Sequence, residues 1–556
     1  MLFLVEVEHV VLLKAQSIGL FANREDDGKV VIACEERNII MVDGPYLMGI
    51  DGGTESVRVG IFNYEGTPVG FASCPYALKH SHPGWAEQDP DEWWSSLVTA
   101  VRTVVSKSGI DPDEIVGISV DSTTCTVVVL DDYDRVLRPA ILWMDVRAAE
   151  QARRIAETGD AALKYNGFAN VSAEWMPCKA LWLKEHEPDI YGAARRICEY
   201  TDWMIHRLTG EWTASVNVAS LRWYYDSDNG GFPVSLYQVV ELDDLLEKFP
   251  QKVLRIGTVV DGLSKKVADE LGLRTGIPVA EGGGDAMIAT VGMNVLEPGK
   301  IALITGSSHA IFGESAKPVY GSGFFGSFTD AVIPGQYVIE AGQASTGSII
   351  KWFRENFCGG LAEAAHQQGL GMYDLLNLRA ESVPIGSDGL LVVDHWQGNR
   401  SPYTDSEARG MILGLTLKHD TAHVYRAIVE GICYGTELIF RTLRNYGFQP
   451  QQIVVCGGPL KSRLWMQTHA DVSNLPITFT KVADAAVLGS AILAAVGAGV
   501  YPSVQDAAHH MVHTSHSIEP DAQRHQEYQF YIEKYIATYP LMSDWMHGLV
   551  RHVDGK

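Results

Sequence analysis

The sequence predicts an α/β fold built from two related halves, and two observations lead to it. From residue 46 onward, short apolar segments with strand-like patterns alternate with longer segments of helical periodicity, which is typical of α/β proteins. Two distant segments, residues 48–66 and 300–312, share one design in which two apolar strands flank a glycine turn. This repeated pattern indicates a duplicated fold, in which each half places its turn at a shared cleft.

Length and composition describe a large globular protein. The chain has 556 residues, too many for one ordinary hydrophobic core, so we expect two or more domains. Its formal net charge of −24 argues against nucleic acid and anionic membranes as partners. No apolar run approaches the roughly 20 residues of a membrane span, and the eight cysteines show no metal-ligand spacing. We therefore expect a cytoplasmic protein with reduced, buried thiols.

The first 45 residues do not resemble the chain that follows. Their short apolar runs are broken by polar patches such as NREDDGK, and the segment ends in DGP just before the first glycine hairpin. The N-terminus lacks a basic leader, so a signal peptide is not expected. We interpret residues 1–45 as an accessory or spurious extension, with Met41 and Met48 as alternative natural starts.

The first glycine hairpin, MGIDGGTESVRVGIFNYEG, carries groups suited to a phosphate. Its turn consists of Gly52, Gly53 and Thr54, and glycines allow an anion to approach the backbone amides closely. Asp51 ends the first strand and offers a hard oxygen ligand for Mg²⁺. Arg58 adds a fixed cation on the second strand. An ordinary glycine-rich hairpin is the alternative, and only the rest of the chain distinguishes the two.

The remaining elements follow from periodicity and from helix and turn signals. In the first half we expect a helix over 91–105, strands over 115–120 and 126–130, a helix opening at 143–147 and a helix over 286–291. In the second half we expect the hairpin at 300–312, a strand–Gly-Gly–helix unit over 453–470, a helix of small residues over 484–495 and a helical tail. The boundary between the halves is placed near 295–300, where Leu-Glu-Pro-Gly interrupts the pattern.

The common nucleotide fingerprints are missing. The Walker pattern G-x-x-x-x-G-K-[ST] does not occur, and GSGFFG at 321–326 precedes a loop and a strand where a dinucleotide site needs a helix. What remains is a nucleotide cleft with hairpin phosphate loops, an arrangement suited to phosphoryl transfer. That reaction needs a base near the acceptor oxygen. Asp285, which follows three glycines at a helix start, is the candidate, and a plain helix N-cap is the alternative.

Taken together, these motifs resemble those of the FGGY carbohydrate kinases, members of the sugar kinase and actin-like ATPase superfamily, over roughly residues 46–500. The likeness rests on IDGGTESVRVGIF, GWAEQDPDEWW, WMDVRA, GGGDA, ITGSSH, GMILGLTLKHDTAHVYRAIVE and CGGPLKSRLWMQTHAD, which occur in the family's order. It implies an α/β fold of two actin-like, ribonuclease H-like ATPase domains around a central cleft. It also implies ATP and Mg²⁺ as cofactors and a small sugar as substrate.

Within the family, the sequence is most similar to the ribulose kinase branch, through DSTTCTVVVLD, SAEWMPCKALWLKE, EAGQASTGSIIKWF and DHWQGNRSPYTD. This likeness implies ATP-dependent phosphorylation of a terminal hydroxyl of a small ketose, ribulose in the first place. Kinases for xylulose, erythritol or erythrulose, and glycerol are the alternatives. Which carbon is phosphorylated stays open.

The resemblance also implies roles for single residues. Asp285 is the base, Arg58 stabilises the transferring charge and Asp51 holds Mg²⁺. ATP contacts are expected from Gly52, Gly53, Thr54, Thr305, Gly306, Ser307, Gly457 and Gly458. Sugar contacts are expected from Glu87, Asp145, Arg222 and Glu340. Relatives tend to carry lysine where this chain has Arg222, a bulkier forked donor. A helix cap is the alternative for Glu87, and an ion pair with Arg147 is the alternative for Asp145.

The predicted domains are the extension 1–45, a sugar and phosphate domain over 46–297, an adenosine domain over 298–500 and a C-terminal helical tail over 501–556. A homodimer is compatible with the sequence. Two rival classes are an actin-like chaperone or filament ATPase and a catalytically silent sugar sensor. Asp51 and the GGGDA carboxylate are both present, which favours an enzyme over either rival.

Overall fold

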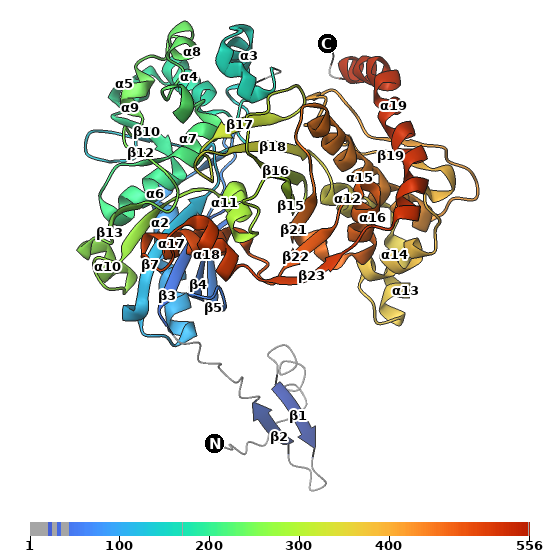
Figure 1. The fold of residues 1–556 in the computed structure, drawn as a ribbon, viewed down its shortest axis with the longest axis horizontal. Coiled ribbons are helices and arrows are strands. Elements are labelled where there is room, and N and C mark those ends of the chain that lie inside the picture. Colours follow the sequence, from blue (N-terminus) through green and yellow to red (C-terminus); the bar gives the residue numbers. More distant parts are fainter. Residues whose placement is uncertain (1–19, 25–29, 35–43, 169–170, 554, 556) are drawn as a thin grey trace. The chain divides into compact units, whose positions relative to one another are not determined.

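The computed structural model describes residues 20–24, 30–34, 44–168, 171–553 and 555 (Figure 1). The chain divides into two units, Met1–Asp43 and Gly44–Lys556. In the first unit, strands β1 (Leu20–Arg24) and β2 (Val30–Cys34) pair antiparallel. The rest of that unit lies outside the described residues, and the interpretation of residues 1–45 as an extension stays a prediction.

Six strands of the second unit form the first sheet, in the order β13-β14-β7-β3-β4-β5. They are β3 (Tyr46–Gly52), β4 (Ser56–Asn63), β5 (Pro68–Pro75), β7 (Ile115–Ser122), β13 (Val259–Gly262) and β14 (Pro278–Gly284). Strands β3, β4 and β5 form an antiparallel meander, whereas β7 runs parallel to β3 and β14 runs parallel to β7. The carboxyl ends of β3, β7 and β14 therefore meet at one edge, where α/β proteins bind ligands.

Seven strands form the second sheet, in the order β17-β18-β16-β15-β21-β22-β23. They are β15 (Lys300–Thr305), β16 (His309–Ser315), β17 (Phe325–Thr329), β18 (Tyr337–Gln343), β21 (Gln452–Gly457), β22 (Ile477–Thr480) and β23 (Thr514–Ile518). From β18 to β22 the strand order and directions repeat those from β5 to β14. The predicted duplication is confirmed in this topology.

Helices cover both faces of the first sheet, as alternation along β3 requires. Met48 and Ile50 belong to the apolar cluster that includes Trp93 of α2 (Pro90–Ser108) and Tyr200 of α6 (Tyr200–Thr209). Leu47, on the other face, belongs to the cluster that includes α11 (Asp285–Gly292) and α17 (Ala485–Gly497). This half is a three-layer α/β structure.

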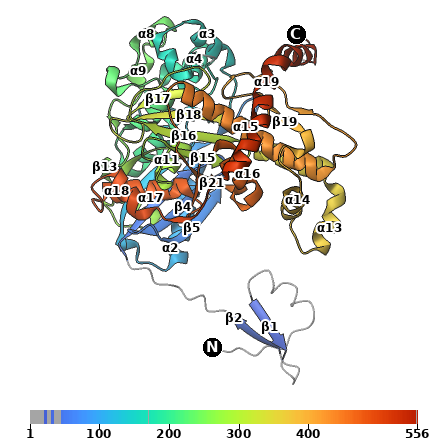
Figure 2. The same ribbon diagram turned by 45° about the vertical axis from the view of Figure 1, so that its right-hand side comes forward.

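Helix α17 follows β22 of the second sheet in the chain but packs on the first sheet (Figures 1 and 2). Glycines make the approach possible, because a Cβ on Gly49 would lie 2.0 Å from the carbonyl oxygen of Val487. On Gly117 it would lie 2.5 Å from that of Ala494. Helix α18 (Val504–Met511) packs on α17, and β23 then returns to the second sheet. The predicted helical tail is thus wrong in one respect, because it contains a strand that completes a sheet.

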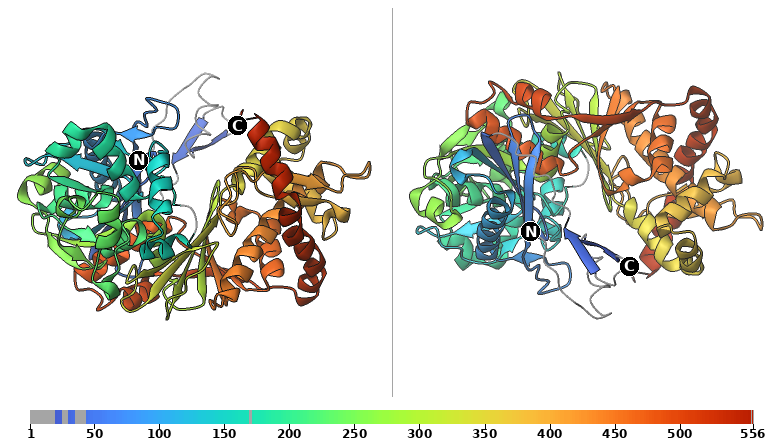
Figure 3. Two further views of the ribbon diagram at one scale, coloured as in Figure 1. Left: turned by 90° about the horizontal axis from the view of Figure 1, so that it is seen from above. Right: turned by 90° about the horizontal axis from the view of Figure 1, so that it is seen from below.

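The second half is built around the long helix α15 (Thr421–Asn445). Around it pack α12 (Gly347–Phe357), α14 (Met372–Glu381), α16 (Arg463–Ser473) and α19 (Ala522–Val553). Helix α19 lies on the side of this half that faces away from the first sheet (Figures 1 and 3). In the described part of the chain, no helix has the length and apolar character needed to cross a membrane.

The chain between β7 and β14, together with β6, which precedes α2, forms a region of short elements. Its sheet has the order β10-β8-β9-β6, with β6 (Glu87–Gln88), β8 (Val127–Leu130), β9 (Ala140–Ile141) and β10 (Arg196–Glu199). Its helices include α3 (Ala149–Glu157), α4 (Met176–His186), α5 (Pro188–Ala193), α7 (Val216–Arg222), α8 (Val234–Val239) and α9 (Leu245–Lys248). The helix predicted to open at 143–147 begins only at Ala149, because Asp145 Oδ1 accepts the Arg147 N–H at 2.9 Å and holds a turn there.

The contact between α17 and the first sheet gives a stability prediction. Gly49→Ala should lower the free energy of unfolding by about 3 kcal/mol or more, because backbone faces backbone and neither can rotate away. Urea denaturation measures the change. The control is Gly192→Ala in α5, where an added Cβ meets no atom within 4 Å; it should be neutral or stabilise by up to about 1 kcal/mol. Equal stabilities for both variants would contradict the proposed close packing.

Candidate active site

Residues from both halves line one cavity of about 290 Å³. The first half contributes Thr54, Thr123, Thr124, Cys125, Trp143, Glu174, Leu221, Arg222, Gly284, Asp285, Ala286 and Met287. The second half contributes Ser308, Ala310, Phe312, Glu340 and Arg400. The two predicted glycine hairpins are about 250 residues apart in the sequence, yet both reach the same cavity, through Thr54 and Ser308. A shared cleft between the halves is the arrangement that the sequence predicts.

Strand β14 delivers Asp285 to this cavity through three glycines. A Cβ on Gly282 would lie 1.7 Å from the carbonyl oxygen of Val120 on β7, so only glycine allows this strand contact. Gly284 is the N-cap of α11, and Asp285 is its first helical residue. Its Oδ1 accepts the N–H of Ala286 at 2.6 Å. The helix-cap alternative for Asp285 is therefore wrong, and its half-buried carboxylate faces the cavity.

The surroundings of Asp285 disfavour its charge. Burial raises its pKa to about 7, the negative charge of Asp51 adds to the shift, and the Ala286 amide and Arg58 oppose it. A carboxyl group with a pKa near neutrality is suited to accept a proton from an alcohol and to release it again. Perturbed carboxylates in a cavity are characteristic of catalytic sites.

A second pair of carboxylates lies at the ends of β3 and β7. Asp51 and Asp121 are register neighbours on these parallel strands, and both are fully buried. Asp121 accepts a hydrogen bond from Ser490 Oγ at 2.6 Å, yet Oδ1 of each aspartate has no partner. Burial raises the pKa of both groups, and the charge of Asp51 raises that of Asp121 further. Two unpartnered buried oxygens fit a hard divalent cation whose other ligands are water and phosphate oxygens.

Among the described residues, no group of three or more His, Cys, Asp or Glu side chains has the geometry of a protein-only metal site. Arg58, predicted beside the transferring phosphate, pairs with Asp51 and with Asp484, at 3.2 Å from the latter. It is not among the residues that line the cavity. The structure places Arg58 next to the Asp51 carboxylate, where it balances part of the negative charge.

Both predicted phosphate turns are well formed. In the first, the Gly53 N–H donates to the carbonyl oxygen of Ser56 at 3.1 Å, which closes the hairpin. In the second, the Gly306 N–H donates to the carbonyl oxygen of Ser308 at 2.9 Å, and Thr305 is the last residue of β15. Ser307 accepts the Thr346 N–H at 2.9 Å, so the start of α12 packs against this turn. Gly52 lies against the ring of Tyr200, which leaves no room for a side chain.

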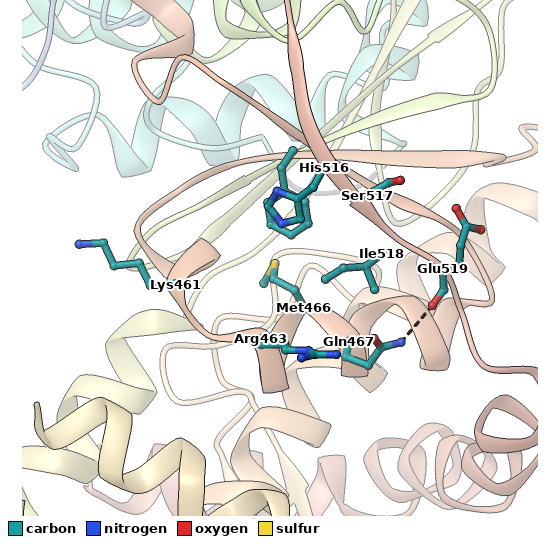
Figure 4. A pocket seen from close by; sticks show the side chains of 9 residues that line it. Lys461, Arg463, Met466, Gln467, His516, Ser517, Ile518 and Glu519 are labelled. Atoms are coloured by element: carbon teal, nitrogen blue, oxygen red, sulfur yellow. Dashed lines mark hydrogen bonds between the residues drawn. The ribbon is translucent and has the colours of Figure 1, made fainter. Parts of the chain in front are cut away.

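The predicted adenosine segment begins beside the second phosphate turn. Gly457 is the register neighbour of Thr305 and has a φ of 112°, a conformation that favours glycine. Gly458 follows it and is exposed. Further along the segment, Lys461 and Arg463 line a separate groove of about 490 Å³ (Figure 4). Neither glycine lines that groove, and their contact with adenosine stays a prediction.

The predicted sugar residues Arg222 and Glu340 meet across the two halves. The Arg222 guanidinium donates to both carboxylate oxygens of Glu340 at 2.9 Å, and Arg400 donates to the same carboxylate at 2.8 Å. Burial alone would raise the pKa of Glu340, but the two guanidinium charges outweigh it and hold the pKa below its usual range. Nε of Arg222 is buried and has no hydrogen-bond partner.

The other two predicted sugar residues, Glu87 and Asp145, do not line the cavity. Arg147 lies between them, at 2.9 Å from the Glu87 carboxylate and 2.7 Å from that of Asp145. Arg138 pairs with Glu87 at 2.6 Å, and its charge and that of Arg147 overcome the effect of burial and lower the pKa of Glu87. The ion-pair alternative for Asp145 is confirmed. The cap alternative for Glu87 is wrong, because Asp89 caps α2.

The sequence reading missed several lining residues. Arg400 lies in DHWQGNRSPYTD and Glu174 in SAEWMPCKALWLKE, two segments that carry the family resemblance, but nothing in either segment marks these residues as facing a cavity. Thr123, Thr124 and Cys125 follow β7 directly. Their place after a parallel strand is the signal that could have found them.

Comparison with known proteins gives a consistent result. Residues 46–292 match the N-terminal domain of the FGGY family of carbohydrate kinases, and residues 301–498 match its C-terminal domain. A ribulokinase of Geobacillus thermodenitrificans is 33% identical over 84% of this chain and 89% of its own length. An FGGY carbohydrate kinase domain-containing protein of Xenopus laevis is 32% identical over 88% of this chain and 95% of its own length. The solved xylulose kinase of Rhodospirillum rubrum superposes with a TM-score of 0.81 at 28% identity, over 90% of this chain and all of its own.

The raised pKa of Asp285 predicts how stability depends on pH. The folded state holds the proton up to about pH 7 and the unfolded chain only up to about 3.9. Stability due to this group is therefore complete below pH 4 and is lost as the pH rises to 7. Asp285→Asn cannot ionise, so its free energy of unfolding does not fall over this pH range. At pH 8 the variant should therefore be more stable than the unmodified protein by about 1–2 kcal/mol, after allowance for solvent screening of a half-buried group.

Urea denaturation of Asp285→Asn and the unmodified protein, in steps from pH 4 to pH 8, measures this difference. The gain should grow up to pH 7 and then stay constant. A gain that does not change with pH would show that Asp285 titrates normally in the folded protein.

Proposed function

The chain belongs to the FGGY family of carbohydrate kinases, and from this premise we propose that it transfers the terminal phosphate of ATP to a terminal hydroxyl of a small ketose, ribulose in the first place. The observation that carries the proposal is the position of Asp285. Its carboxylate lies in one cavity with Thr54 of the first glycine turn and Ser308 of the second. Relatives named ribulokinases, about one-third identical over most of this chain, support the choice of sugar.

In the proposed reaction, the sugar hydroxyl loses its proton to the Asp285 carboxylate as its oxygen attacks the γ-phosphorus. A new P–O bond forms, the bond from that phosphorus to the β–γ bridging oxygen breaks, and ADP leaves with the bonding electron pair. Amides of the turns at 52–54 and 306–308 orient the phosphates. Asp51 and Asp121 would hold Mg²⁺, which neutralises phosphate charge when bound.

The sugar is proposed to lie between Asp285 and the Arg222–Glu340–Arg400 cluster. Arg222 and Arg400 line the cavity and can donate to sugar oxygens, and Glu340, already paired with both arginines, keeps the two guanidinium groups in place. Glu87 and Asp145 are not proposed as sugar contacts. Because each half supplies part of the cavity, closure of the halves would complete the site and exclude water as a competing acceptor.

A neighbouring sugar class stays as the second candidate. The xylulose kinase of Rhodospirillum rubrum shares 28% identity over most of this chain, close to the value for the ribulokinases. Ketopentoses differ in the orientation of single hydroxyls, which a few side chains distinguish. The family resemblance implies a lysine where this chain has Arg222, and we expect this cavity residue to influence which ketose the chain accepts.

A substrate screen tests the proposed function. Coupled ADP release should be measured with D- and L-ribulose, D- and L-xylulose, ribitol, erythritol, L-erythrulose and glycerol. We expect one enantiomer of ribulose to stimulate release at least about tenfold over the rate with water alone, because its hydroxyls match the fixed donors of the cavity. A stronger response to xylulose would favour the second candidate. No response to any sugar would refute the ketose kinase proposal.

The proposed base gives a kinetic prediction. Asp285→Asn should lower kcat by about 10²–10⁴-fold, because the amide cannot accept the proton, while ATP binding measured by calorimetry stays near normal. For the unmodified enzyme, kcat should rise with pH up to about 7 and level off above, as Asp285 ionises. The control is Asp261→Asn on β13, an exposed aspartate outside the cavity. Nearly full activity of Asp285→Asn would remove Asp285 from the mechanism.

A further inference from the structure

Lys179 is a fully buried lysine that the proposed reaction does not use. It lies on α4 with no exposed surface. Burying an ammonium group is unfavourable unless hydrogen bonds replace its water. Its Nζ donates to the carbonyl oxygens of Cys125 and Leu142, at 2.7 Å from the second. Both acceptors are neutral backbone groups, and burial lowers the pKa of Lys179. A costly buried charge thus serves to join two turns of the chain.

Both turns belong to the wall of the catalytic cavity. Cys125 lines the cavity itself and has a φ of 61°, in the left-handed region that non-glycine residues rarely adopt. Leu142 is followed by Trp143, which also lines the cavity. The indole Nε1 of Trp143 donates to Thr54 Oγ1 at 3.1 Å. One ammonium group therefore connects the wall after β7, the wall after β9 and, through Trp143, the first phosphate turn.

We propose that Lys179 is a positioning residue that fixes the width of the sugar cavity by holding these two turns together. The inference rests on the proposed function, because its kinetic effect requires a sugar substrate. Lysine suits the task, since its compact tip carries up to three donors at the end of an apolar stem. Methionine would fill similar space but would leave two carbonyl oxygens without their donor, so the turns would move apart.

The alternative is that Lys179 contributes to stability alone. A matched control separates the two roles. Lys184 lies on the same helix, and its Nζ donates to a carboxylate oxygen of Asp244 at 2.9 Å and to the carbonyl oxygen of Glu241, but it has no connection to the cavity. Lys184→Met therefore makes the same chemical change and also removes two hydrogen bonds, away from the site.

The kinetic test compares Lys179→Met with Lys184→Met in the full chain. Lys179→Met should raise the KM for the sugar about tenfold while the KM for ATP stays within about twofold, because the first phosphate turn is closed by its own Gly53–Ser56 hydrogen bond and adenosine is expected to bind the other half. Lys184→Met should leave both constants within about twofold of the unmodified enzyme. A Lys179→Met enzyme that is less stable but keeps its sugar KM would assign the residue to stability and overturn the proposal.

Hydrogen exchange tests the same idea without a substrate. In Lys179→Met, backbone amides at 123–126 and 142–145 should exchange at least about tenfold faster than in Lys184→Met, because the link between the turns is lost. Equal exchange of these turns in the two variants would overturn the proposal whatever the substrate. If the unmodified protein phosphorylates no sugar, the proposed function fails, and the exchange result still decides the role of Lys179.

Discussion

The contact between α17 and the first sheet is the constraint on which the site depends. The helix approaches the strands so closely that backbone meets backbone at Gly49 and Gly117. From this position, Ser490 of the helix donates a hydrogen bond to Asp121. Asp484, which directly precedes the helix, accepts a hydrogen bond from Arg58. The same helix packs on α11, which begins with Asp285. Because one helix touches the elements that carry all three carboxylates, its position sets their relative geometry, and it does so across the boundary between the two halves.

The charge of the site is predominantly negative. For Asp51, Asp121 and Asp285, burial is the main cause of a raised pKa, and Arg58 is the one cation that opposes the shift in each case. Such clustering costs stability in the empty protein. It is useful when a divalent cation and a hydroxyl proton are to be bound there. Glu340 is the opposite case, since two arginines satisfy its carboxylate and hold its pKa low.

Sequence reasoning found the candidate residues that glycines mark directly after a strand, but it missed Thr123, Thr124 and Cys125, which follow β7 without such a mark. The turn after β3 and the glycines before Asp285 could be recognised from the local pattern alone, and the structure brings Thr54 and Asp285 to one cavity. It did not place Glu87, which pairs with Arg138 and does not line the cavity, and for Asp145 its ion-pair alternative with Arg147 is the one that the structure shows. The family resemblance implied sugar contacts for both residues, whereas in the structure both belong to an ion-pair network with Arg147. Arg400 was missed because its partner, Glu340, lies 60 residues away.

The sequence by itself determined the fold class, the duplication, the family and the candidate for the base, because these depend on periodicity and on short motifs whose backbone geometry only glycine allows. The tertiary structure decided which polar side chains line the cavity and which are paired with one another. It also decided that α17, from late in the chain, covers one face of the first sheet. The reason is physical: a side chain's role depends on which charges and carbonyl groups surround it after folding. For Lys179, Arg222 and Asp121, those groups come from distant parts of the chain.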